Sequence, residues 1–217
     1  MYKNKRILAF IPARSGSKRL PKKNKKLLKN KPLFMWTINE AMKSKYLDKL
    51  ILSTDDKEIE NRIKKIKSIL AVKRKKVLAN DKTQVEKVVH DYLSNNNLNY
   101  DLICVLQPTS PLRKAKDIDD AIKSLIKSKH KSLISVCRTT KKSKFIVSIK
   151  NGFIEKKTKN NSKFKLNGAI YLSCIDYFIR HKTFFSSKTI AFKMPKSRSI
   201  DIDTDNDFNK VKIFLNL

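Results

Sequence analysis

The stretch ILAFIPARSGSKRLPKKN, residues 7–24, joins a run of five apolar residues to a strongly basic loop. The run 7–11 predicts a strand buried on both faces, because its consecutive apolar positions leave no side for water. The loop then crowds basic side chains around a glycine and two serines, and these are Arg14, Lys18, Arg19, Lys22 and Lys23. Since like charges repel, we expect either a solvated surface loop or an anionic ligand that gathers them.

The rest of the chain alternates apolar runs with segments of helical periodicity, which predicts an α/β fold. Besides 7–11, we expect strands at residues 50–53, 70–73, 102–107, 132–137, 167–174 and 189–194. We expect helices at residues 33–42, 57–67, 83–94, 118–128 and 204–215. Because a helix follows most of these strands, we expect a mainly parallel sheet flanked by helices.

The length of 217 residues suits one domain, 1–217, and a single segment interrupts its rhythm. Residues 138–166 alternate polar and apolar positions, contain Gly152 and include a stretch rich in Lys and Asn. This pattern predicts a hairpin-like insertion.

The composition is strongly basic, with 51 Lys and Arg against 19 Asp and Glu and a formal net charge of +32. This charge raises the alternative of a basic nucleic-acid-binding protein. Only nine of the basic residues are Arg, however, and the Lys residues are scattered from Lys3 to Lys212. Nucleic-acid surfaces favour clustered charge with aromatic partners or bidentate Arg. We therefore attribute the charge to a compositional bias, as an AT-rich genome would produce, and expect no specific nucleic-acid partner.

The sequence predicts a cytoplasmic protein without a membrane partner. No apolar run reaches the roughly 18 residues of a membrane span, and the start of the chain does not resemble a signal peptide. Cys104, Cys137 and Cys174 stand singly in apolar segments, which predicts buried thiols and no metal site.

Charged segments follow several expected strands. In open α/β sheets, ligands gather where the carboxyl ends of the strands meet. The basic loop, the segment QPTSPLR (residues 107–113) and the segment DIDT (residues 201–204) should therefore share one edge. Arg14, Lys18 and Lys23 beside Gly16 suit a polyphosphate, although the loop is not a Walker A sequence.

Asp201 and Asp203 are spaced two residues apart, so an extended segment places both carboxylates on one face. A divalent cation such as Mg²⁺ would relieve their repulsion and bridge to phosphate oxygens. The alternative is a helix cap with solvated acids. Together with the basic loop, the metal hypothesis predicts phosphoryl or nucleotidyl transfer.

Four motifs occur in an order that resembles one family: IPARSGSKRLPKKN, LQPTSPLR, NGAIYL and SIDIDT. From about residue 6 to residue 215, the chain is similar to the acylneuraminate cytidylyltransferases, also called CMP-sialic acid synthetases. The resemblance implies a Rossmann-like nucleotidyltransferase fold whose small insertion, 138–166 here, forms a homodimer. It also implies Mg²⁺-dependent activation of a nine-carbon 2-keto sugar acid with CTP, giving the CMP-sugar and pyrophosphate.

The resemblance also implies roles for individual residues. It assigns Arg14, Lys18, Lys23 and Asn24 to the CTP phosphates and nearby ribose, Arg74 to the cytosine, Gln107 to the sugar acid, and Asp201 and Asp203 to the metal. Of these, Arg14, Lys23 and Asp203 are expected to act in catalysis. The alternatives are that Arg74 is a solvated member of a basic patch and that Gln107 only ties down its own loop.

Two departures from the family pattern bear on the sugar. The segment FKLNGAIY has Lys165 where the family commonly has the Arg that holds the sugar carboxylate, and Lys keeps the charge but loses the bidentate fork. The segment SKR replaces the frequent SKG. Both point towards the diamino-sugar branch of the family, such as legionaminic acid. Within the enzyme class the alternative is a 3-deoxy-manno-octulosonate cytidylyltransferase, against which KKN and LQPTSPLR argue; a non-catalytic relative is a further alternative.

Overall fold

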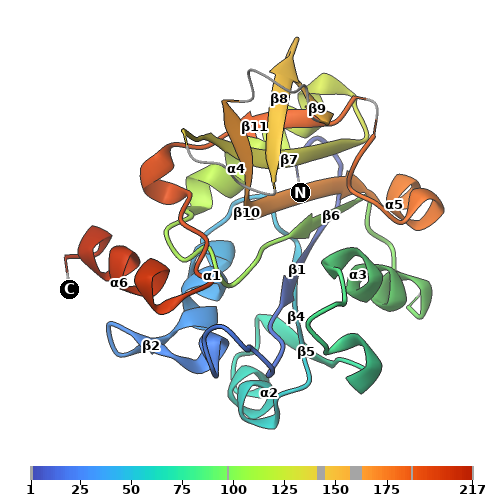
Figure 1. Cartoon of the computed structure of the whole chain (residues 1–217). Coiled ribbons are helices and arrows are strands. Elements are labelled where there is room, and N and C mark those ends of the chain that lie inside the picture. The colour runs from blue at the N-terminus through green and yellow to red at the C-terminus, as the bar shows by residue number, and fades with distance from the viewer. Residues whose placement is uncertain (1, 97, 141–144, 157–162, 187, 217) are drawn as a thin grey trace.

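The computed structural model describes residues 2–96, 98–140, 145–156, 163–186 and 188–216, and its centre is a nine-stranded sheet (Figure 1). The strand order is β5-β4-β1-β6-β10-β7-β11-β9-β8. The strands are β1 (Ile7–Pro12), β4 (Lys49–Thr54), β5 (Ile69–Lys73), β6 (Leu102–Val105), β7 (Ser132–Arg138), β8 (Ile146–Lys150), β9 (Phe153–Lys156), β10 (Phe164–Cys174) and β11 (Ile190–Lys193), with a separate pair β2 (Leu27–Leu28) and β3 (Lys31–Pro32). The α-helices are α1 (Leu33–Met42), α2 (Lys57–Lys64), α3 (Val85–Ser94), α4 (Ala115–Ser128), α5 (Ile175–His181) and α6 (Asp205–Phe214).

The sheet is mixed, which corrects the expected mainly parallel sheet. Strands β5, β4, β1 and β6 run parallel, as predicted, and β11 runs parallel to β7. Strand β10 lies between β6 and β7 and runs antiparallel to both. The physical reason is its connection: the chain reaches β10 from the β8–β9 hairpin, without the crossover helix that a parallel neighbour of β7 would need.

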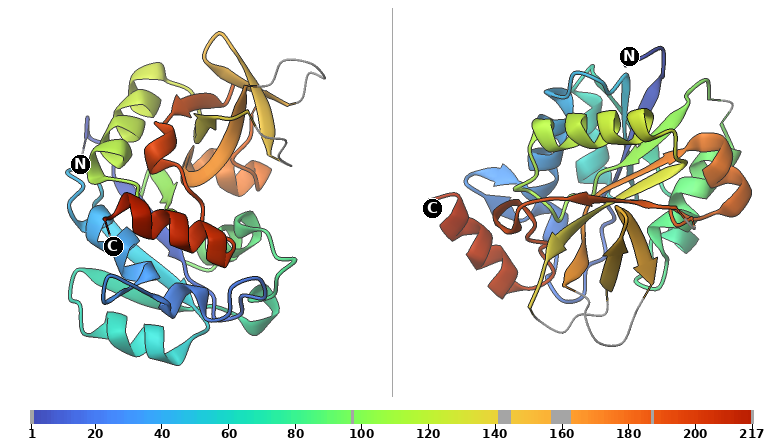
Figure 2. Two further views of the ribbon diagram at one scale, coloured as in Figure 1. Left: turned by 60° about the vertical axis from the view of Figure 1, so that its left-hand side comes forward. Right: turned by 90° about the horizontal axis from the view of Figure 1, so that it is seen from above.

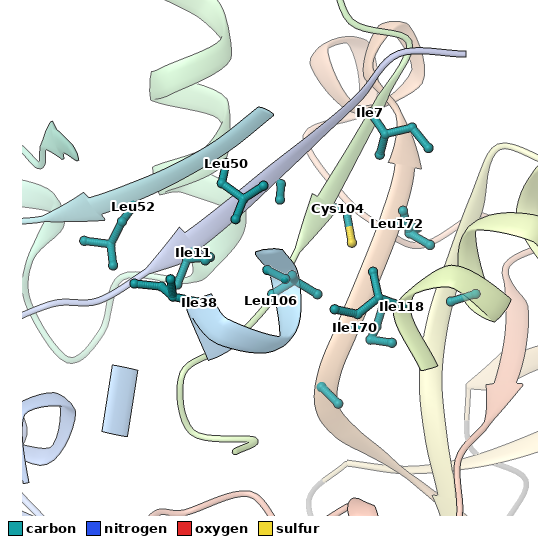
Figure 3. Close-up of a cluster of buried hydrophobic side chains, with 14 of the residues drawn as sticks. Ile7, Ile11, Ile38, Leu50, Leu52, Cys104, Leu106, Ile118, Ile170 and Leu172 are labelled. Carbon is teal, nitrogen blue, oxygen red and sulfur yellow. The ribbon is translucent and has the colours of Figure 1, made fainter. Parts of the chain in front are cut away.

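Strand β1 is buried on both faces, as its apolar run predicts. Ile7, Ala9 and Ile11 belong to the cluster beneath α1, α2 and α4, whereas Leu8 and Phe10 belong to the cluster beneath α3 and α5. Figure 3 shows the first cluster, with helix side chains packed over β4, β1, β6 and β10. Each buried Ile, Leu or Phe side chain contributes roughly 1.5–3 kcal/mol, so this strand anchors the segment that follows it.

The predicted insertion contains a β-hairpin. Strands β8 and β9 pair antiparallel, and Asn151 and Gly152 between them have φ values of 50° and 84°, the left-handed pair that a tight hairpin turn requires. The hairpin joins the main sheet through β10 and β11 and lies at the opposite end of the sheet from β5 and α2 (Figure 2). Residues 141–144 and 157–162 of the insertion lie outside the described residues, and its role in dimerisation stays a prediction.

Helix α6 begins directly after DIDT. Thr204 accepts a hydrogen bond from the backbone N–H of Asp207 (3.2 Å), and the backbone N–H of Thr204 donates to the Asp207 carboxylate (3.0 Å). This capping box fixes the start of the helix. Phe208 and Val211 of α6 pack against Leu28 of β2, so α6 lies beside β2 and α1 in Figure 1. The segment before α6 is thereby held against the basic loop.

The structure also bears on two further predictions, which concern the cysteines and membrane-spanning helices. Cys104 and Cys137 are buried, Cys174 is partly buried, and all three are free thiols. In the described part of the chain, no helix combines the length and the apolar character that crossing a membrane requires.

Candidate active site

The carboxyl ends of the parallel strands meet at a cavity of about 200 Å³. The loop after β1, the residue after β5 and the loop after β6 all reach it, as does the segment before α6. Most of the predicted site residues line this cavity, namely Arg14, Lys23, Asn24, Arg74, Gln107, Asp201 and Asp203. The basic loop, QPTSPLR and DIDT therefore meet at one edge of the sheet, as predicted.

Lys23 joins the basic loop to DIDT. Its side chain is buried, and its Nζ donates to the carbonyl of Ile202 (2.8 Å) and to the Asp203 carboxylate (2.9 Å). The other Asp203 oxygen is 3.1 Å from the guanidinium of Arg19. A buried ammonium needs such partners, because removing it from water without them is costly. The loop and the acidic segment are thus one connected unit.

The basic loop is also fixed to its neighbours by hydrogen bonds that do not involve its basic side chains. The Asn24 side-chain amide donates to the carbonyl of Arg14 (2.8 Å), and the backbone N–H of Ser15 donates to Asp55 (2.8 Å). Asp55 follows β4, so the loop is tied to the end of a second parallel strand. These bonds fix the backbone of the loop around Arg14 and Ser15.

Arg14 and Lys18 share one acidic partner. Asp81 accepts from Arg14 at 2.5 Å and lies 3.5 Å from Lys18. The hydrogen bond from Arg14 lowers the pKa of Asp81. The Lys18 side chain is 87% exposed, and among the described residues Lys18 is not part of the cavity lining. Lys18 therefore lies at the rim, beside Arg14.

Arg74 is a buried residue in the wall of the cavity, so the alternative of a solvated side chain is wrong. It is 6% exposed, and its guanidinium donates to the carbonyl of Ser53 (3.1 Å) and to the Ser53 hydroxyl (3.4 Å). Burial lowers its pKa to about 10, an effect that Asp55 opposes and Arg14 reinforces. The side chain stays cationic at neutral pH and has a fixed orientation.

Asp201 carries an unused acceptor. Its Oδ1 is fully covered and has no hydrogen-bond partner among the described residues. Burial raises the pKa of Asp201 to about 6, and a hydrogen bond from Thr109 opposes this rise. The cap of α6 is supplied by Thr204 and Asp207, so Asp201 and Asp203 are not needed there.

The two aspartates fit a magnesium ion that takes its other ligands from a substrate. Among the described residues there is no group of three or more His, Cys, Asp or Glu side chains able to hold a metal. Mg²⁺ is commonly bound by one or two carboxylates together with phosphate oxygens and water. The orphaned oxygen of Asp201, next to Asp203, meets this requirement.

A larger cavity of about 640 Å³ adjoins the first and shares Thr83, Val85, Gln107 and Asp201 with it. Its other walls come from distant segments: the start of α3, the start of the hairpin, and β10. Much of the lining is apolar or aromatic, namely Phe145, Ile146, Val147, Leu166, Tyr171 and Phe185. The combined site thus has a charged part and an apolar part, joined at Gln107.

Gly168 explains the glycine of the NGAIYL motif. Its φ is +73°, and a Cβ atom there would lie 2.9 Å from the Gln107 side-chain oxygen and 3.5 Å from Asp201. Only glycine combines this backbone conformation with so close an approach. The Gln107 amide therefore rests against the β10 backbone, while its own loop is tied through the Gln107 carbonyl.

Lys165 is not among the described residues that line either cavity. Its neighbours Leu166 and Gly168 line the larger one. Lys165 is close enough for its charge to oppose the burial-driven rise of the Asp201 pKa. The structure thus brings seven of the predicted residues together and leaves Lys18 and Lys165 at the margins.

Some site residues were not predicted. Thr109 lies within the QPTSPLR motif, a segment that the sequence had singled out, whereas Asp81 stood outside the quoted motifs. The remaining ones carried no signal, because the apolar residues of the hairpin and of β10 look like ordinary strand residues until the fold brings them to the cavity. Glu86 of α3 is a polar residue that lines the larger cavity, and it too had no signal in the sequence.

A family model described as Cytidylyltransferase matches residues 8–214. The chain belongs to the cytidylyltransferase family. Among relatives, a CMP-N,N'-diacetyllegionaminic acid synthase from Legionella pneumophila is 36% identical, covering 94% of this chain and 93% of the relative. An N-acylneuraminate cytidylyltransferase from Streptococcus agalactiae is 34% identical and covers 93% of this chain, which spans 51% of that longer protein. A pseudaminic acid cytidylyltransferase from Campylobacter jejuni is 30% identical, with 95% and 94% coverage.

Solved structures show the same fold at lower identity. A CMP:2-keto-3-deoxy-manno-octonic acid synthetase complexed with CTP has a TM-score of 0.78 at 16% identity, covering 97% of this chain and 98% of the other. A 4-diphosphocytidyl-2C-methyl-D-erythritol synthase from Anaerococcus prevotii has a TM-score of 0.71 at 14% identity, covering 98% and 97%. At these identities the likeness concerns the fold alone. It establishes that this cytidylyltransferase has an α/β fold with a mixed sheet flanked by helices.

Proposed function

We propose that this cytidylyltransferase activates a nine-carbon 2-keto sugar acid with CTP, releasing the CMP-sugar and pyrophosphate. The observation that carries the proposal is the continuity of a cationic cavity holding two aspartates with a larger, partly apolar cavity. A nucleoside triphosphate fits the first part and a sugar acid the second. Relatives named for legionaminic, neuraminic and pseudaminic acids support this substrate class.

The charged part has donors for each portion of CTP. Arg14 and Lys23 would neutralise the phosphates, with Lys18 at the rim and Asn24 near the ribose. Arg74, buried and fixed by Ser53, would lie near the cytosine. Buried donors of fixed orientation discriminate strongly between bases, because a mismatched partner leaves them unpaired.

The reaction depends mainly on electrostatic stabilisation of the developing charge and does not require a covalent enzyme intermediate. The anomeric hydroxyl of the sugar acid attacks the α-phosphorus, an oxygen–phosphorus bond forms, and the bond to the pyrophosphate oxygen breaks with its electron pair. The hydroxyl proton passes to solvent or to a carboxylate of the pair. Arg14 and Lys23 stabilise the departing pyrophosphate. We propose that Asp201 and Asp203 hold Mg²⁺, which supplies further positive charge at the phosphates when bound.

The sugar acid would lie against Gln107, with its acyl groups on the apolar wall. That wall suits the methyl groups of acylamino substituents, which a 3-deoxy-manno-octulosonate lacks. Lys165 would meet the sugar carboxylate only if its side chain turned towards the cavity that its neighbours line. We also propose that the enzyme is cytoplasmic and a homodimer formed through the hairpin.

The test is a pyrophosphate-release assay with CTP, Mg²⁺ and a panel of sugar acids: N-acetylneuraminate, diacetyllegionaminate and 3-deoxy-manno-octulosonate. We expect turnover with an acylamino nonulosonic acid, no release without a sugar acid, and much lower rates with UTP, ATP or GTP. Comparable rates with UTP would contradict the nucleotide assignment. Preference for 3-deoxy-manno-octulosonate would replace the proposed sugar class, and release with none of the acids would refute the function.

A further inference from the structure

Arg113 is a buried guanidinium directly behind the site. It is 1% exposed and ends the QPTSPLR segment, one residue before the Lys114 that precedes α4. Its Nη1 donates to the carbonyls of Ala169 (2.7 Å) and Gln107 (3.2 Å), and its Nη2 donates to the Thr37 hydroxyl (2.8 Å). All of these partners are uncharged, and burial lowers the pKa of Arg113 to about 10. A charge buried on such partners is costly, so its position calls for an explanation.

The two carbonyls belong to the segments that meet at the junction of the two cavities. Gln107 lines both cavities, and Ala169 follows Gly168, whose backbone lies against the Gln107 side-chain oxygen. One nitrogen of Arg113 therefore fixes the separation between the loop after β6 and the middle of β10. That separation decides where the Gln107 amide points.

We propose that Arg113 is a positioning residue for the sugar acid, acting through Gln107. This inference rests on the proposed function, because the contact between Gln107 and the sugar acid is itself part of that proposal. Lysine could not replace arginine: a single ammonium does not have the planar fork whose two ends reach β10 and α1 at once. An Arg113 variant should therefore bind the sugar acid more weakly and bind CTP as the unsubstituted enzyme does.

The test is a double-mutant cycle with Arg113→Lys and Gln107→Ala, measuring KM for each substrate. We expect Arg113→Lys to raise the KM for the sugar acid at least about tenfold and to leave that for CTP within about twofold. In the Gln107→Ala background, Arg113→Lys should raise the sugar KM no further, because residues that act through one another are not additive. Additive effects would overturn the inference.

The matched control is Arg198→Lys. Arg198 also uses two guanidinium nitrogens, which donate to Asp117 at the start of α4 (2.9 and 2.8 Å), and it lies outside both cavities in the described residues. A purely structural role would lower the melting temperature of both variants and leave their KM values unchanged. A sugar KM unchanged in Arg113→Lys would therefore overturn the proposal.

The experiment distinguishes failure of this inference from failure of the proposed function. If Arg113→Lys does not fold, Arg113→Gln provides an uncharged donor for the same cycle. If Gln107→Ala leaves the sugar KM unchanged while pyrophosphate is still released, the inference fails but the proposed function stands. Failure of the unsubstituted enzyme to release pyrophosphate with any sugar acid would refute the proposed function itself.

Discussion

Asp203 pairs with two basic side chains of the loop after β1. One of its oxygens accepts from Lys23 and the other lies beside Arg19, and the side chain is still 37% exposed. A carboxylate in this setting can exchange a cationic partner for a metal ion without being uncovered first. Its neighbour Asp201 has the covered oxygen that lacks a partner in the described structure.

Replacing Asp203 with Asn should lower kcat at least about 10²-fold, the loss of about 2.7 kcal/mol of transition-state stabilisation. The amide keeps the shape but removes the negative charge that a metal ion needs. The measurement is kcat as a function of Mg²⁺ concentration, with Asp205→Asn as the control, because Asp205 pairs only with Lys26 on the surface among the described contacts. Near-normal kcat and Mg²⁺ dependence would exclude a metal role.

A second residue-scale prediction uses two glycines of similar backbone. Gly168 and Gly152 have φ values of +73° and +84°, but a Cβ would meet Gln107 at 2.9 Å only at Gly168, and nothing within 4 Å at Gly152. Alanine at either position should cost about 1 kcal/mol of stability or more through its backbone conformation. Only Gly168→Ala should also raise the KM for the sugar acid. Equal kinetics in the two variants would show that the contact with Gln107 is unimportant.

At the scale of elements, helix α6 determines where the acidic segment lies. Its capping box and its packing on β2 hold Asp201 and Asp203 at the carboxyl edge of the sheet. The helix is exposed along much of its length, so its start contributes a large part of what fixes it.

Thr204→Ala should therefore lower the free energy of unfolding by about 1 kcal/mol, because one N–H at the helix start loses its acceptor. The measurement is the urea midpoint. The control is Asn209→Ala, an exposed position within the same helix, where alanine should be neutral or slightly stabilising. Equal midpoints for the two variants would mean that the cap does not hold the helix.

The sequence was sufficient for the elements whose signals are local. Strand β1 and helices α1 and α6 were all predicted within one residue of their bounds, from the apolar run of the strand and the periodicity of the helices. The antiparallel direction of β10 was not, because direction depends on how the chain connects and not on residue pattern. The basic loop, QPTSPLR and DIDT could be grouped in advance, because loops that follow parallel strands meet at one edge of the sheet. Arg74 was assigned only through the family resemblance, and the apolar wall from Phe145 to Val147 was not predicted.

At the scale of the whole molecule, the charge of +32 is the dominant property. The acids form ion pairs from Lys5–Asp101 to Lys26–Asp205, but 51 bases outnumber 19 acids by 32, so the excess positive charge is not neutralised within the chain. Such an imbalance destabilises the compact state through self-repulsion. The protein should therefore respond to salt more strongly than a balanced one.

Raising NaCl from about 0.02 to 0.2 M should increase the melting temperature, because the screening length falls to about 10 Å or less over this range. A fall would indicate that the ion pairs outweigh the repulsion. In the same salt series, binding to duplex DNA should be weak, independent of sequence and lost by about 0.2 M, as expected for scattered Lys. Tight binding at that salt concentration would support the nucleic-acid alternative.

The place of β10 in the sheet also sets the order in which the molecule can be completed. Strands β5, β4, β1 and β6 all come from residues 7–105, so they can pair as soon as that part has left the ribosome. Their edge at β6 then waits, unpaired, until residue 174 has been made, because β10 is the strand that covers it. An unpaired, fully apolar edge strand is a site of aggregation. Synthesis rate and chaperone supply, more than final stability, should therefore determine how much of this protein is recovered folded.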